Sequence, residues 1–237
     1  MRKNEQDVLE KVRQDFSEDI KVLEKNLDNI ERCVELLQRE VPYLQQDSLS
    51  ERLIETDDVT RRKAVYFILI KHSYTFLVAA RLLLVTGYIS PSLSCLRTAY
   101  ESFHSGHICG SLDAQAKNFI QGKPINKKAA LDYPVHLNEG LSRQMKRTLS
   151  EFGVHSSYHA LENQARFEGS IFIDENYETY RFIFVRNIWS FEMMVALLLD
   201  YLFGNHQDLV KRVDQGPELL RELMERIARN EKRLLRE

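Results

Sequence analysis

The sequence predicts an all-α protein, a bundle of about six to eight helices with a long coiled-coil-like helix at its N-terminus. Glycine and proline are scarce, nine and five of 237 residues, whereas an all-β chain needs turn residues about every ten positions. Apolar residues recur in steps of three and four, the period of an amphipathic helix. The composition, 43% hydrophobic and 29% charged, is that of an ordinary globular protein.

Residues 5–40 are expected to form one long helix that ends before Pro42. Its apolar residues follow a heptad seam with charged residues around it. The seam consists of Ile20, Leu23, Leu27, Ile30, Val34, Leu37 and Val41. So narrow a seam needs a partner, which is either a second copy of the chain, giving a homodimer, or the helix predicted at 217–236.

Two long apolar helices are expected at the centre of the bundle. The first spans about 58–87, and Ser90 and Pro91 then provide an N-cap and first residue for a helix over 91–110. The short link makes these two helices an antiparallel hairpin. The second apolar helix spans about 176–203. Helices that are apolar on nearly every face are buried in the middle of a bundle.

The other segments are shorter. Residues 43–56 form a polar connection, and residues 167–174 have strand-like character. Further helices are predicted over 113–121, 138–152 and 206–214. We divide the chain into an N-terminal coiled-coil arm, 1–42, and a helical bundle domain, 43–237, whose C-terminal helix at 217–236 is a candidate to pack on the arm.

Charge and cysteine content exclude several classes of protein. The net charge is −2 and the pI about 6.4, so no global charge directs the chain to nucleic acid or to an anionic membrane. Cys33, Cys95 and Cys109 lack the CxxC spacing of zinc or redox sites. The opening residues are polar, and charges such as Lys71 and Arg81 interrupt the apolar runs. We expect a cytoplasmic protein with no membrane segment and no cofactor.

The helix over 91–110 carries Arg97, Glu101 and His104 along one line. The antiparallel hairpin is expected to bring Arg81 to the level of Arg97, and Tyr74 to that of His104. Arg81 is the only charge in an apolar stretch, and a buried guanidinium needs a carboxylate or an anion. The candidate partners are Glu101, Glu192 and Asp200.

These residues have two interpretations. One is a structural network of ion pairs that fixes the register of the helices. The other is a site for a phosphate-bearing substrate, in which Arg97 and Arg81 hold the anion, Tyr74 contributes to binding and His104 transfers a proton.

The run from Arg97 to His104, RTAYESFH, has six residues between its arginine and its histidine. This spacing resembles the Arg-x(4–6)-His motif of the HEPN superfamily, and the match covers roughly residues 58–110. The resemblance implies a helical bundle and a metal-independent ribonuclease of a bacterial toxin or phage-defence system, with an antitoxin as a possible partner. It also implies that His104 acts as general base or acid at a 2′-hydroxyl, that Arg97 binds the scissile phosphate, and that Glu101 orients one of them. Sites of this superfamily usually form at a dimer interface.

Two other functions compete with RNA cleavage. His155, His159, Glu162 and Arg166 share one face if their segment is helical, and two histidines at i and i+4 with a carboxylate can hold a divalent metal. The chain would then be a metal-binding helical protein. The remaining alternative is a non-catalytic interaction module that oligomerises through residues 5–41.

Overall fold

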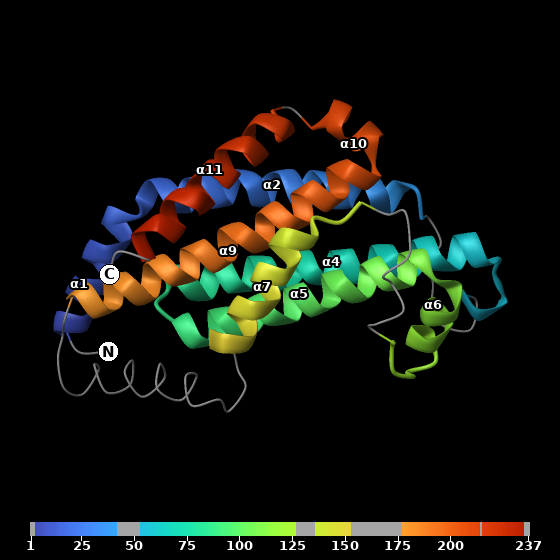
Figure 1. Cartoon of the computed structure of the whole chain (residues 1–237), viewed down its shortest axis with the longest axis horizontal. Helices are drawn as coiled ribbons and strands as arrows, with labels where there is room; N and C mark the ends of the chain where they lie inside the picture. Colours follow the sequence, from blue (N-terminus) through green and yellow to red (C-terminus); the bar gives the residue numbers. More distant parts are fainter. Residues whose placement is uncertain (1–2, 42–52, 127–135, 153–176, 214, 235–237) are drawn as a thin grey trace.

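The computed structural model describes residues 3–41, 53–126, 136–152, 177–213 and 215–234, and within these ranges the long elements of secondary structure are all helices (Figure 1). The predicted all-α bundle is confirmed. The elements are α1 (Lys3–Asp15), α2 (Ser17–Arg39), α4 (Asp58–Val85), α5 (Ile89–Ser111), α6 (Asp113–Ile120), α7 (Glu139–Phe152), α9 (Tyr177–Asn205), α10 (Gln207–Arg212) and α11 (Gly216–Leu234). The described residues thus form more helices than the six to eight expected. The strand-like segment 167–174 lies outside them.

Helix α9 is the centre of the bundle. Figure 1 shows it between the α4–α5 hairpin on one side and α2 with α11 on the other. Every side chain from Phe184 to Leu199 is buried. The prediction that this apolar helix lies in the middle of the bundle is confirmed.

Helices α4 and α5 form the predicted antiparallel hairpin. The side chain of Asp57 caps α4 by accepting a hydrogen bond from the backbone N–H of Thr60 at 2.9 Å. At the other end Gly87 has a φ of 88°, which a glycine adopts without strain. Helix α5 begins at Ile89, with Tyr88 at the N-cap position in place of the expected Ser90.

Small residues bring the two helices of the hairpin close together. Ser73 Oγ donates to the carbonyl oxygen of Ala99, and Ser92 Oγ donates to that of Ala80, each at 2.8 Å. A Cβ atom on Gly106 would lie 3.2 Å from Leu69 Cβ. Such contacts fix both the register of the hairpin and the face that α5 turns to α4.

The outer face of α4 is more exposed than its apolar sequence predicts. Leu82 has 51% of its surface exposed, and Lys71 and His72 are exposed as well. The reason is that α9 covers only part of α4, whose main contact is with α5. Among the described helices α4 alone is long and apolar enough to span a membrane, a test that core helices of soluble proteins also pass.

The N-terminal segment is not one continuous helix. A turn at Phe16 separates α1 from α2, and the Phe16 ring packs against Phe184 of α9, with 5.7 Å between ring centroids. The apolar seam of α2 is buried within this one chain, where α2 packs on α4, α9 and α11. Its fully or nearly fully buried residues are Leu23, Leu27, Ile30, Val34 and Leu37.

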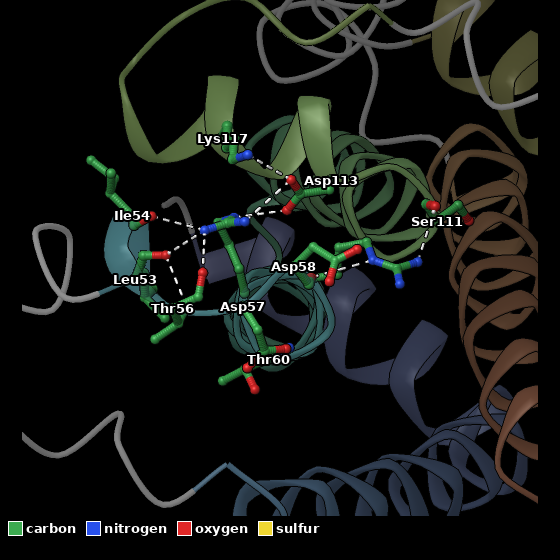
Figure 2. A network of polar contacts seen from close by, with 11 residues as sticks. Leu53, Ile54, Thr56, Asp57, Asp58, Thr60, Ser111, Asp113 and Lys117 are labelled. Atoms are coloured by element: carbon green, nitrogen blue, oxygen red, sulfur yellow. Dashed lines mark hydrogen bonds and ion pairs between the residues drawn. The ribbon is translucent and has the colours of Figure 1, made fainter.

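A buried arginine ties the start of α4 to α6 (Figure 2). Arg61 is 3% exposed, and its Nε and Nη2 donate to the carboxylate of Asp113 at 2.7 and 3.2 Å. Its Nη1 donates to the carbonyl oxygens of Leu53, Ile54 and Thr56. The positive charge of Arg61 is paired with Asp113, and its N–H groups donate hydrogen bonds. These interactions offset the free-energy cost of burying the guanidinium.

Candidate functional site

The three residues singled out on α5 lie together as the helical spacing requires. Arg97 Nε donates to Glu101 Oε1 at 3.0 Å, and these side chains are 24% and 46% exposed. The ring of His104 is partly buried, with its centroid 6.0 Å from that of Tyr100 and 6.4 Å from that of His107. Arg97, Glu101 and His104, which we call the stripe, thus combine an ion pair open to solvent with a partly buried imidazole.

The stripe faces away from α4. Ala99 and Ser102 are on the face that contacts α4, through Ser73 and His72 respectively. At about 100° per residue, Arg97, Glu101 and His104 lie roughly 140–160° around the helix from Ala99. Residues of α4 therefore do not share a site with the stripe.

Arg81 and Tyr74 belong to a different surface, and the expectation that they face the stripe is wrong. Arg81 forms an ion pair with Glu24 of α2. Tyr74 also interacts with α2: burial raises the pKa of its hydroxyl to about 12, and the carboxylate of Glu31 adds to the rise. Both side chains are on the face of α4 that α2 covers.

None of the three carboxylates predicted for Arg81 is its partner. Glu101 pairs with Arg97, while Glu192 accepts from Asn230 Nδ2 at 2.8 Å. Asp200 is 2.8 Å from Nε2 of His136. The hairpin register also differs, because Ala80 lies level with Ser92 and so moves Arg81 away from Arg97.

Helix α7 lies alongside the stripe. The Tyr100 hydroxyl of α5 donates to the carbonyl oxygen of Ser142 at 3.3 Å, and its oxygen is 3.2 Å from Ser142 Oγ. The apolar face of α7 is buried, and its buried residues include Leu141, Met145 and Leu149. The opposite face exposes Arg143, Lys146 and Arg147.

The exposed cations of α7 form the basic part of this surface. Lys146 follows Ser142 by four residues, so it lies one turn further along α7 and about 40° around the helix, at the edge of the basic face nearest to Ser142. Arg143 is 80% exposed, and its Nη2 lies 3.8 Å from a carboxylate oxygen of Glu139. The amphipathic pattern of α7 was the signal available in the sequence, but it does not show which helix its buried face covers.

His107 is a core residue and not part of the exposed stripe. Its side chain is 4% exposed, and the ring packs edge-on against Tyr201 with 5.5 Å between centroids. Burial lowers the pKa of His107 below its usual value, which favours the neutral imidazole.

The alternative metal site cannot be placed on the structure, because His155, His159 and Glu162 lie outside the described residues. Within the described ranges, no group of three or more histidine, cysteine, aspartate or glutamate side chains has the arrangement of a metal site.

Comparison of the chain with family models, with curated proteins and with solved structures gives no match to any of them.

Proposed function

We propose that the chain acts on RNA in the cytoplasm, as a HEPN-like, metal-independent endoribonuclease of a toxin or phage-defence type. The observation that supports it is the group of Arg97, Glu101 and His104 on α5, together with exposed cations on α7, the helix that packs on α5 through Tyr100 and Ser142. A histidine can move a proton, an arginine can bind a phosphate, and nearby cations can hold the rest of a nucleic-acid strand.

The chemistry needs a proton acceptor and a charge that stabilises the reacting phosphate. In the proposal His104 takes the proton of a ribose 2′-hydroxyl, whose oxygen bonds to the adjacent phosphorus. The bond from phosphorus to the 5′-oxygen of the next nucleotide breaks, and that oxygen takes a proton from solvent. The products are a 2′,3′-cyclic phosphate and a 5′-hydroxyl end.

Arg97 and Glu101 act as a pair in this scheme. The guanidinium of Arg97 stabilises the negative charge that develops on the phosphoryl oxygens. Glu101 holds Arg97 through the 3.0 Å hydrogen bond from Nε to Oε1. Arg81 and Tyr74 have no part in the scheme, because both face α2.

The test is cleavage of a single-stranded RNA by the purified chain, with and without EDTA. We expect cleavage that survives EDTA and is lost in His104→Ala, with a 2′,3′-cyclic phosphate among the products. His72→Ala is the matched control, because His72 is an exposed histidine on the other side of the hairpin, bonded to Ser102. Melting temperatures of all three proteins establish that they are folded.

The outcomes separate the competing functions. If EDTA abolishes cleavage, the reaction needs a metal, and His155 and His159 become the candidate ligands. Equal cleavage by the wild type and His104→Ala would remove His104 from the mechanism. The absence of cleavage by folded protein would overturn the ribonuclease proposal.

A non-catalytic interaction module is the second candidate, and exposed apolar residues favour it. Tyr88 and Leu82, at the tip of the α4–α5 hairpin, are 63% and 51% exposed. The seam of α2 is covered within the chain, so it is not open to a second copy. The tip of the hairpin is an apolar surface through which the chain can form a homodimer or bind a protein partner such as an antitoxin. Sedimentation of the wild type beside Leu82→Ser with Tyr88→Ser tests it, because loss of association in the double variant is the expected result.

A further inference from the structure

The C-terminal helix α11 lies along α9 and against α2 (Figure 1). Leu223 and Ile227 are buried in this interface, and so is the polar side chain of Asn230, of which 2% is exposed. Asn230 Nδ2 donates to Oε2 of Glu192 on α9 at 2.8 Å. Two buried polar side chains therefore join the C-terminal part of α11 to the central helix.

Glu192 is a fully buried acid, with 0% of its surface exposed. Its other oxygen, Oε1, has no hydrogen-bond partner among the residues that the structure describes. If Glu192 were ionised here, the one hydrogen bond that would stabilise its negative charge among the described residues is that from the Asn230 amide. An ionised group with so little compensation strongly destabilises a buried interface.

The charged groups around Glu192 do not supply the missing compensation. Asp19 of α2 faces it with like charge, and Arg226 and Arg229 of α11 face it with opposite charge. Arg226 is already bonded to Asp19, with 2.7 Å between Nη1 and Oδ1 and both side chains about 15% exposed. Arg233 reaches only the far side of the cluster, where it donates to Asn230 Oδ1 at 3.2 Å.

We propose that Glu192 and Asn230 form a proton-dependent clasp, in which α11 docks on α9 when Glu192 is a neutral carboxylic acid. Burial raises the pKa of Glu192 from 4.5 to about 8, and Asp19 adds to the rise, while the Asn230 hydrogen bond and the two arginines reduce it. When α11 separates from α9, Glu192 meets water and its pKa returns toward the ordinary value.

The sign of the pH effect follows from this difference. The docked state holds a proton that the undocked state loses above about pH 4.5. Docking is therefore strongest below that pH, weakens as the pH rises to about 8, and changes little above it. Within this window each pH unit shifts the equilibrium for opening of α11 by up to about tenfold.

Hydrogen exchange of the full chain tests the clasp directly. Protection factors of α11 amides, corrected for the intrinsic pH dependence of exchange, are measured between about pH 5.5 and 7.5. We expect them to fall about tenfold per pH unit in the wild type. In Glu192→Gln, which keeps the shape and an oxygen for Asn230, we expect no dependence on pH. Amides of α5 serve as the reference for global opening.

Three results would overturn the proposal. The first is pH-independent protection of α11 in the wild type, and the second is an equal slope in Glu192→Gln. The third is exchange of α11 only together with α5, which would show that the helix opens with the whole fold. If Glu192→Gln does not fold, the infrared carbonyl band of a protonated carboxylic acid provides the test on the wild type. The band is expected at about pH 6, where ordinary carboxylates are ionised, and its absence there would contradict the clasp.

Discussion

The hydroxyl groups of Tyr100 on α5 and Ser142 on α7 lie 3.2 Å apart, and the Tyr100 hydroxyl also reaches the carbonyl oxygen of Ser142 at 3.3 Å. This contact links the two helices that form the proposed RNA-binding surface. Both residues are buried, so the bonds are shielded from water.

Tyr100→Phe keeps the ring and removes the hydroxyl from this contact. We expect the free energy of unfolding to fall by roughly 1 kcal/mol, because a buried hydrogen bond is lost and the Ser142 hydroxyl loses a partner. Urea unfolding measures the change. Tyr88→Phe, at a 63% exposed position, is the control and should leave the stability nearly unchanged.

Arg61→Met replaces a buried cation by an apolar side chain of similar length. We expect a loss of about 3–5 kcal/mol, since the Asp113 carboxylate and the carbonyl oxygens of Leu53, Ile54 and Thr56 all lose a donor. Denaturant unfolding tests it. A loss no larger than that of Arg143→Met, at an 80% exposed arginine, would show that the network contributes little.

The ion pair of Asp113 predicts sensitivity to acid. The hydrogen bond from Arg61 is the main cause that lowers the pKa of Asp113 below 3.8. Because the pKa is lowered in the folded state, this stabilisation is present at neutral pH and is lost as the pH falls through the folded value. In Asp113→Asn, stability should therefore fall less steeply than in the wild type below about pH 4. The measurement is the melting temperature as a function of pH. An unchanged acid profile would contradict this assignment.

Gly106→Ala tests the close approach of α4 and α5. Alanine is the better helix former by up to about 1 kcal/mol, but its Cβ would lie 3.2 Å from Leu69 Cβ, an atom attached to the backbone. We expect net destabilisation in a thermal melt. Gly140→Ala on α7 is the matched control, because its new Cβ meets only Asn138 Oδ1 at 3.5 Å, and it should be neutral or stabilising.

Charge reversal on α7 tests the proposed RNA surface separately from cleavage. Lys146→Glu is expected to weaken RNA binding and to reduce the slope of log affinity against log salt by about one. Lys71→Glu changes another exposed lysine, on the outer face of α4, and is the control. Fluorescence anisotropy at several salt concentrations measures both, and equal effects of the two variants would argue against a specific surface on α7.

The local features of the fold were predictable from the sequence. Gly87 predicted the turn of the α4–α5 hairpin, because a left-handed residue ends many helices and its φ is positive. The burial of α9 was predictable from a run of side chains that is apolar on every face. Both depend on residues that are close together along the chain.

What depends on distant packing was not predictable. The partner of Arg81 is Glu24, and only the placement of α2 over α4 brings them together. The break at Phe16 carries neither glycine nor proline, and it coincides with a ring contact to Phe184, a residue far away in the sequence. The direction of the Arg97 stripe depends on the rotation of α5, which the small residues facing α4 determine.

The central position of α9 has a consequence for synthesis of the chain on the ribosome. Phe16 and the seam of α2 are made first, but the Phe184 ring and the α9 surface that cover them emerge much later. At about 5–20 residues per second, that delay is on the order of ten seconds. During this time α1 and α2 expose an apolar surface, so chaperone binding to nascent chains should be strongest before α9 is complete.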